Sequence, residues 1–130
     1  MTQHVHGSFD VKVTPQTHTD GIGDPAIGRM SLDKRFYGEL DAASLGQMIA
    51  YRTAVDGSAG YVAMERVVGT LVGKRGAFVL QHSSTMTRGT PQQSITVVPD
   101  SGTDELVGLS GSMTITIAEK KHFYDFTFTV

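Results

Sequence analysis

Residues 61–82, YVAMERVVGTLVGKRGAFVLQH, have the pattern of two β-strands joined by a tight turn. Apolar and polar side chains alternate on both sides of GKRG, which is typical of a β-hairpin. Successive strand residues point to opposite faces of a sheet. Because Glu65 and Arg66 are adjacent, one charge lies on the buried face whichever face that is. The charged residue that is buried marks a candidate polar site.

Hairpin register predicts the neighbours of Glu65. If the two central residues of GKRG form the tip of the turn, Glu65 lies opposite Ser84 and diagonal to His82. If DGSAG, residues 56–60, is the loop of the preceding hairpin, Tyr51 also lies opposite Glu65. We therefore expect a row of side chains across three strands: Tyr51, Glu65 and His82, with Tyr61 and Ser84 nearby.

A carboxylate, an imidazole and a phenol are the usual groups for acid–base catalysis or for orienting a polar ligand. We therefore take Glu65 and His82 as candidate catalytic residues, with Glu65 as the acid–base group. Tyr51, Tyr61 and Ser84 are candidate ligand-binding residues. The alternative is a buried network that satisfies its own hydrogen bonds and has only a structural role.

Period-2 alternation continues along the chain and favours an all-β protein with eight antiparallel strands in one domain, residues 1–130. Such a set predicts a sandwich or a closed meander barrel, and closure removes exposed strand edges. An eight-stranded barrel is just wide enough for packed side chains or one small ligand. The expected strands are 7–13, 30–40, 45–55, 61–71, 77–87, 94–98, 112–117 and 122–130.

The last predicted hairpin has a four-residue turn, AEKK, residues 118–121. Its register forms one apolar face, on which Tyr124 belongs either to the core or to the wall of a ligand cavity. The expected opposing pairs are Ile117 with His122, Ile115 with Tyr124, and Met113 with Phe126.

The composition excludes several classes of protein. The net charge is −2 without a basic cluster, which disfavours nucleic-acid binding. There is no cysteine, so disulfides and cysteine-ligated metals are absent. No apolar run approaches the roughly 20 residues of a membrane-spanning helix. We expect a cytoplasmic protein with no membrane association and no cofactor.

His4 and His6 are two residues apart and share one face of the first strand. Two histidines in this arrangement can bind a metal ion together. No third ligand follows at a suggestive spacing, so we expect an exposed segment and no metal. The alternative is a metal site completed by His82 or His122.

Four blocks of the sequence resemble a bacterial domain family of unknown function that is similar in fold to plant allene oxide cyclase. They are MSLDKRFYGEL (30–40), GSAGYVAMERVVGTLVGKRGAFVLQH (57–82), VVPDSGTDELVGLSGSM (97–113) and HFYDFTF (122–128). The resemblance implies a closed eight-stranded antiparallel meander barrel. Related barrels include cyclases and dirigent-like proteins, which bind apolar intermediates and are commonly oligomeric.

Two functions follow as expectations. The first is binding of a mainly apolar small molecule in the barrel lumen, with a cyclase-like or isomerase-like reaction by positioning if the protein is an enzyme. The second is a non-catalytic, homo-oligomeric structural protein whose barrel is filled by its own side chains. A cavity of at least roughly 300 Å³ distinguishes the first from the second.

Overall fold

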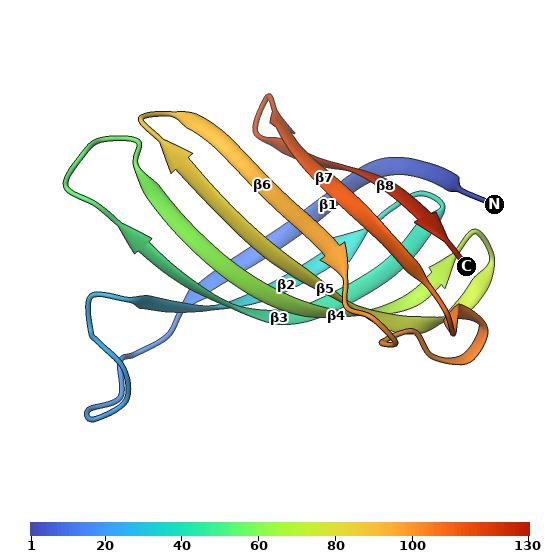
Figure 1. Ribbon diagram of the computed structural model, residues 1–130, viewed down its shortest axis with the longest axis horizontal. Coiled ribbons are helices and arrows are strands. Elements are labelled where there is room, and N and C mark those ends of the chain that lie inside the picture. Colours follow the sequence, from blue (N-terminus) through green and yellow to red (C-terminus); the bar gives the residue numbers. More distant parts are fainter.

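The computed structural model describes residues 1–130 and contains eight β-strands and one short 3₁₀-helix. Neighbouring strands along the chain are antiparallel, and β1 also pairs with β8, so the sheet closes into a barrel (Figure 1). The predicted fold is confirmed. The elements are β1 (Gln3–Pro15), β2 (Gly28–Phe36), β3 (Leu40–Arg52), β4 (Ala59–Leu71), β5 (Lys74–Thr87), β6 (Thr90–Val97), η1 (Asp104–Leu106), β7 (Ser110–Ala118) and β8 (Lys121–Thr129).

The β4–β5 turn lies two residues earlier than predicted and, like the predicted turn, has a two-residue tip. Leu71 pairs with Lys74, so Val72 and Gly73 form the tip. Both have positive φ, 49° and 76°, as a two-residue turn that follows the twist of the strands requires. The register of the hairpin is therefore shifted by four residues, and Glu65 pairs with Leu80 instead of Ser84. An even shift leaves every side chain on its predicted face.

The β2–β3 turn also differs from the prediction. The strand expected over 30–40 ends at Phe36, and the next begins at Leu40, so DAAS, residues 41–44, lies within β3. The β3–β4 loop spans 53–58, and Tyr51 pairs with Gly60 instead of Glu65. This register is shifted by five residues, and an odd shift moves Tyr51 to the opposite face.

The end of the barrel near the two termini is filled by side chains. Phe36, Phe78 and Tyr124 are almost completely buried there. The register predicted for the last hairpin is confirmed, including Met113 opposite Phe126. The aromatic rings pack edge to face or stacked, with centroids 5.1–5.8 Å apart. This half of the lumen is therefore a solid hydrophobic core.

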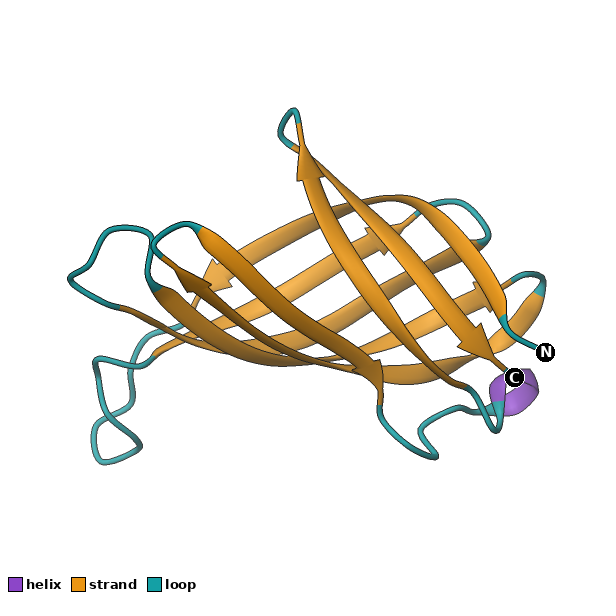
Figure 2. Cartoon of the chain, turned by 45° about the horizontal axis from the view of Figure 1, so that its top comes forward, coloured by secondary structure: helices purple, strands orange, loops and turns teal.

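The connection between β6 and β7 completes this closed end (Figure 2). Leu106 and Leu109 are buried in the core. Ser101 Oγ and Thr103 Oγ1 accept hydrogen bonds from the backbone of β5 at Val79 and Ala77, both at 3.0 Å. The loop thus accepts hydrogen bonds from backbone N–H groups of β5 that β6 is too short to reach.

The β6–β7 seam has the shortest ladder of the barrel, with only two paired positions. The Gln93 side chain lengthens it. Its Oε1 accepts a hydrogen bond from the Ile115 backbone N–H at 2.7 Å, and its Nε2 donates to the Ile115 carbonyl oxygen at 3.3 Å.

The structure contains no helix with the length and apolar character needed to cross a bilayer.

Candidate functional site

Four polar side chains from four successive strands meet inside the barrel. Lys34 lies on β2, Ser44 on β3, Glu65 on β4 and His82 on β5, and each has at most 6% of its surface exposed. They occupy inward positions because each alternates with outward-facing neighbours along its strand. We call these four residues the polar layer.

Glu65 is the centre of the polar layer. Lys34 Nζ donates a hydrogen bond to Oε2 at 2.8 Å, and Ser44 Oγ donates one to Oε1 at 2.7 Å. His82 Nε2 lies 2.6 Å from Oε2. A buried carboxylate with three such neighbours is compensated, whereas an isolated one would be strongly destabilising.

The ionisation of Glu65 follows from these contacts. Burial alone would raise the pKa of this carboxyl group. The contact with His82 and the positive charge of Lys34 outweigh that effect and lower its pKa from 4.5 to about 2. Glu65 is therefore a carboxylate at neutral pH and has no proton to donate as a general acid.

Lys34 is held on two sides. Its ammonium nitrogen lies 5.0 Å from the centre of the Phe9 ring and 5.9 Å from that of Phe36, as well as contacting Glu65. Aromatic faces attract a cation when water is excluded. The ammonium group is thus compensated by one carboxylate and two rings.

His82 is less well satisfied than its neighbours. Although Nε2 is close to Glu65, the ring N–H does not point at the carboxylate, and this buried nitrogen has no hydrogen-bond partner. The contact is close but is not a directed hydrogen bond.

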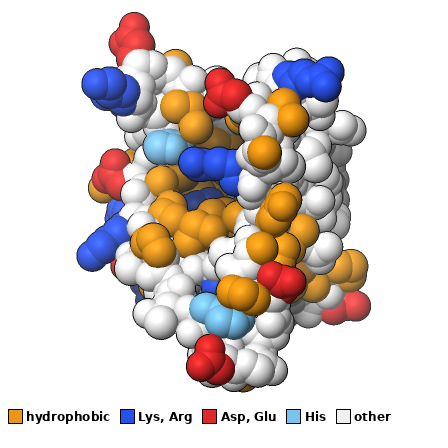
Figure 3. Space-filling model, turned by 90° about the vertical axis from the view of Figure 1, so that its left-hand side faces the viewer, with side chains coloured by type: hydrophobic (Ala, Val, Ile, Leu, Met, Phe, Trp, Pro, Cys, Tyr) orange, Lys and Arg blue, Asp and Glu red, His pale blue; other side chains and the backbone are white.

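The opposite end of the barrel, at the β1–β2, β3–β4 and β5–β6 connections, is hollow. Figure 3 looks onto this end and shows hydrophobic side chains gathered around the hollow. The cavity has a volume of about 530 Å³ and is open to solvent. This lies within the range of ordinary small-molecule sites. Its inward-facing lining includes Met30, Met48, Ala50, Tyr61, Ser84 and Met86.

Besides Arg52 on β3, the polar side chains on the inner wall of this cavity are those of Tyr61 and Ser84. They pair across β4 and β5, and one step deeper along the same face His82 lies opposite Ala63. Burial raises the pKa of the Tyr61 phenol, and contact with Ser84 opposes the rise. A neutral phenol that can donate a hydrogen bond therefore stands between the mouth and the polar layer.

The predicted site residues fall in three places. Glu65 and His82 meet in the lumen, as predicted, although neither lines the cavity itself. Tyr61 and Ser84 line the cavity wall, and Tyr51 lies at its rim with 47% of its surface exposed. Tyr124 is in the filled half, where its hydroxyl donates to the carbonyl oxygen of Tyr37 at 2.7 Å.

Sequence reasoning missed Lys34 and Ser44. Lys34 is in phase with Leu32 and Phe36, which form the apolar face of β2. This alternation is visible in the sequence and predicts that Lys34 faces inward. Ser44 lies in the DAAS segment, between the expected strands 30–40 and 45–55, so no inward position was predicted for it. Gly46, directly opposite Glu65, carries a related signal. A Cβ there would lie 2.3 Å from the Met64 carbonyl oxygen and 2.7 Å from the Glu65 Cβ, so the close approach of β3 to β4 beside Glu65 requires a glycine.

Comparison with other proteins gives the family but not an activity. Residues 5–128 match the family described as "Protein of unknown function (DUF3224)". No curated protein matches the chain in sequence.

A similar structure comes from Shewanella oneidensis MR-1, the crystal structure of a DUF3224 family protein of unknown function. It is 50% identical and superposes with a TM-score of 0.90 over 99% of this chain and 98% of the other. The family match covers nearly the whole barrel, including every strand that contributes to the polar layer. The chain therefore belongs to the DUF3224 family.

Proposed function

We propose that the protein binds a small, mainly apolar molecule in the open half of its barrel. The observation that carries this proposal is the cavity of about 530 Å³ above a buried polar layer. Three methionines line it, and flexible thioether side chains adapt to irregular apolar ligands. The filled half provides a rigid base.

The ligand is expected to have one polar group at its inner end. Tyr61 and Ser84 are the first polar side chains that it meets along the β4–β5 wall, and His82 lies one layer deeper, in contact with Glu65. Few polar groups in an apolar pocket fix orientation more than they add affinity. An alcohol, ketone or carboxylate at the end of an apolar body fits this arrangement.

Catalysis is a further step that the resemblance to allene oxide cyclase suggests. Ring closure or isomerisation in such a cavity would proceed by positioning of the substrate. The lowered pKa of Glu65 argues against this residue as the acid–base group, so its role in such a reaction is to hold Lys34 and His82. We therefore place binding before catalysis.

The experiment uses 1-anilinonaphthalene-8-sulfonate, an apolar fluorescent probe with one anionic group. We expect its fluorescence to rise on binding to the wild-type protein and to lose most of this rise in Ala50→Trp, which fills the cavity. Thr96→Trp places the same ring on the outer face of β6, away from the cavity, and serves as the control. Equal binding to both variants would place the probe outside the cavity and refute the proposal.

Native mass spectrometry of protein purified from its own host complements the dye. A retained small molecule that is lost in Ala50→Trp and kept in Thr96→Trp identifies the natural ligand class. A retained molecule unaffected by Ala50→Trp counts against the cavity as its site. The same spectra report the number of subunits.

We propose homo-oligomerisation as a second, structural role. The outer face of β3 and β4 is apolar and exposed, with Leu45 70%, Val62 52% and Val68 50% accessible. These side chains surround the outward-facing Arg66, and exposed apolar side chains gathered on one face are typical of a protein contact. Sedimentation of wild type and Leu45→Glu at micromolar concentrations tests it, and a monomeric wild type rejects it.

A further inference from the structure

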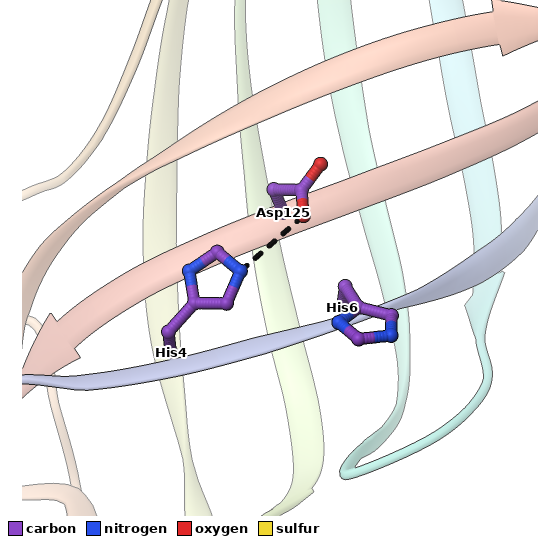
Figure 4. Close-up of side chains that lie close together, drawn as sticks. All are labelled: His4, His6 and Asp125. Atoms are coloured by element: carbon purple, nitrogen blue, oxygen red, sulfur yellow. Dashed lines mark ion pairs between the residues drawn. The ribbon is translucent and has the colours of Figure 1, made fainter.

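A second cluster of imidazole and carboxylate side chains lies on the outer wall of the barrel, away from the cavity. His4 and His6 on β1 flank the buried Val5, so both point outward. His6 pairs with Asp125 on β8, and His4 pairs with Thr127. The two imidazoles and the carboxylate therefore gather over one pair of strands (Figure 4).

The possible ligand atoms of these three side chains are spaced close to the distances found around a bound metal ion. One ligand atom from each of His4, His6 and Asp125 can be chosen so that all three lie within 4.8 Å of one another. His4 Nε2 lies 3.4 Å from Asp125 Oδ1. In a tetrahedral site with bonds of about 2.0–2.1 Å, ligand atoms are about 3.4 Å apart. One pair already has this spacing, and side-chain rotation can bring His6 to it.

The surroundings allow that rotation. The side chains of His4 and Asp125 are 54% and 48% exposed, and His6 is exposed as well. The strand backbone beneath them is fixed by the β1–β8 ladder, which holds the three Cα positions. The exposed side chains can therefore rotate to surround an ion while the backbone of β1 and β8 stays in place.

Thr127 orients one of the imidazoles. Its Oγ1 lies 3.1 Å from Nδ1 of His4, on the side of the ring away from Asp125. A hydrogen bond from Nδ1–H to this oxygen leaves the Nε2 lone pair free and directed toward the carboxylate. Metal-binding histidines almost always have such a partner on their second nitrogen.

We infer that His4, His6 and Asp125 bind a divalent first-row transition-metal ion such as Zn²⁺. Two neutral imidazoles and one carboxylate form a ligand set that Zn²⁺ accepts with water in its remaining position. The alternative metal site with His82 or His122 is not formed, because His82 faces the lumen and His122 lies against Phe9, with ring centroids 5.2 Å apart. The third ligand comes from β8 instead.

An ordinary surface ion pair between His4 and Asp125 is the competing explanation. Such a pair contributes little to stability and involves no role for His6. The two explanations differ in whether His6, which is not part of the ion pair, matters for metal affinity.

The test is calorimetric titration of tag-free protein with Zn²⁺. We expect one ion per chain in the wild type and a loss of binding by tenfold or more in His6→Ala and in Asp125→Asn. His18→Ala is the matched control, because His18 is an exposed histidine in the β1–β2 loop, and it should bind as wild type. Thr127→Val should bind about tenfold more weakly.

Co²⁺ provides a second readout. Its visible absorption is strong when three protein ligands hold it in a tetrahedral site and weak when it remains hydrated. Far-ultraviolet circular dichroism of each variant checks that the barrel is intact. The inference is overturned if wild type does not bind Zn²⁺, if His6→Ala and Asp125→Asn bind as wild type, or if His18→Ala weakens binding equally.

Discussion

Acid should destabilise this protein through Glu65 in a pH range that the structure defines. The carboxyl group has a pKa of about 2 in the folded protein and an ordinary value of 4.5. The folded state therefore binds fewer protons than the unfolded chain between these values. Its contribution to stability is complete above pH 4.5 and is lost as the pH falls through about 2.

The magnitude follows from the same two values. At about 1.4 kcal/mol for each pH unit, the difference corresponds to about 3 kcal/mol of the free energy of unfolding. Glu65 is 1% exposed, so screening by solvent does not reduce this figure substantially. A domain of this kind is stabilised by about 5–15 kcal/mol in total. The loss should therefore be easy to measure.

The assay is urea unfolding at a series of pH values, followed by circular dichroism because the chain has no tryptophan. Glu65→Gln leaves Lys34 buried and unpaired, which costs about 3–5 kcal/mol and can prevent folding. The reference is therefore the double variant Lys34→Met, Glu65→Leu, which replaces the pair by apolar groups.

All other carboxyl groups are common to the wild type and the double variant. The wild type should lose about 3 kcal/mol more than the double variant between about pH 5 and pH 2. An equal loss in both proteins would show that Glu65 is not held as a carboxylate by Lys34 and His82. The description of the polar layer would then be wrong.

Three further substitutions test the packing around the site by urea or thermal unfolding. Ser44→Ala removes a hydrogen bond to a buried carboxylate and should cost about 1.5–3 kcal/mol, whereas no loss would exclude that bond. Gly46→Ala should cost about 1–3 kcal/mol because its Cβ meets backbone at 2.3 Å, whereas Gly60→Ala, with 3.6 Å of room, should cost far less. Tyr124→Phe leaves a carbonyl oxygen unpaired and should cost about 1 kcal/mol, and an unchanged stability would contradict the bond.

The sequence was sufficient for the fold because alternation along strands is a local property. This alternation predicts an all-β chain of eight antiparallel strands but is compatible with a sandwich as well as a barrel, and the resemblance to the allene oxide cyclase-like family favoured the closed barrel. The register of the hairpin around AEKK was predicted correctly, since its two strands are strongly patterned on both sides of the turn, although Ala118 and Lys121 pair as well and shorten the turn to two residues. Positions of turns were less predictable, because the Val72–Gly73 tip places a β-branched residue at positive φ, which residue preferences disfavour.

Two errors in the predicted register had opposite consequences for the site, because successive side chains alternate between the two faces of a strand. The β4–β5 register was wrong by four residues, an even number, so Glu65 and His82 remained on one face and still meet diagonally. The β3–β4 register was wrong by five, so Tyr51 moved outward and Ser44 took the inward place beside Glu65. Face assignment therefore depends only on whether a loop error is odd or even, whereas contact partners depend on its size. This is why the sequence identified the charge that lies inside the barrel but could not identify all of its partners.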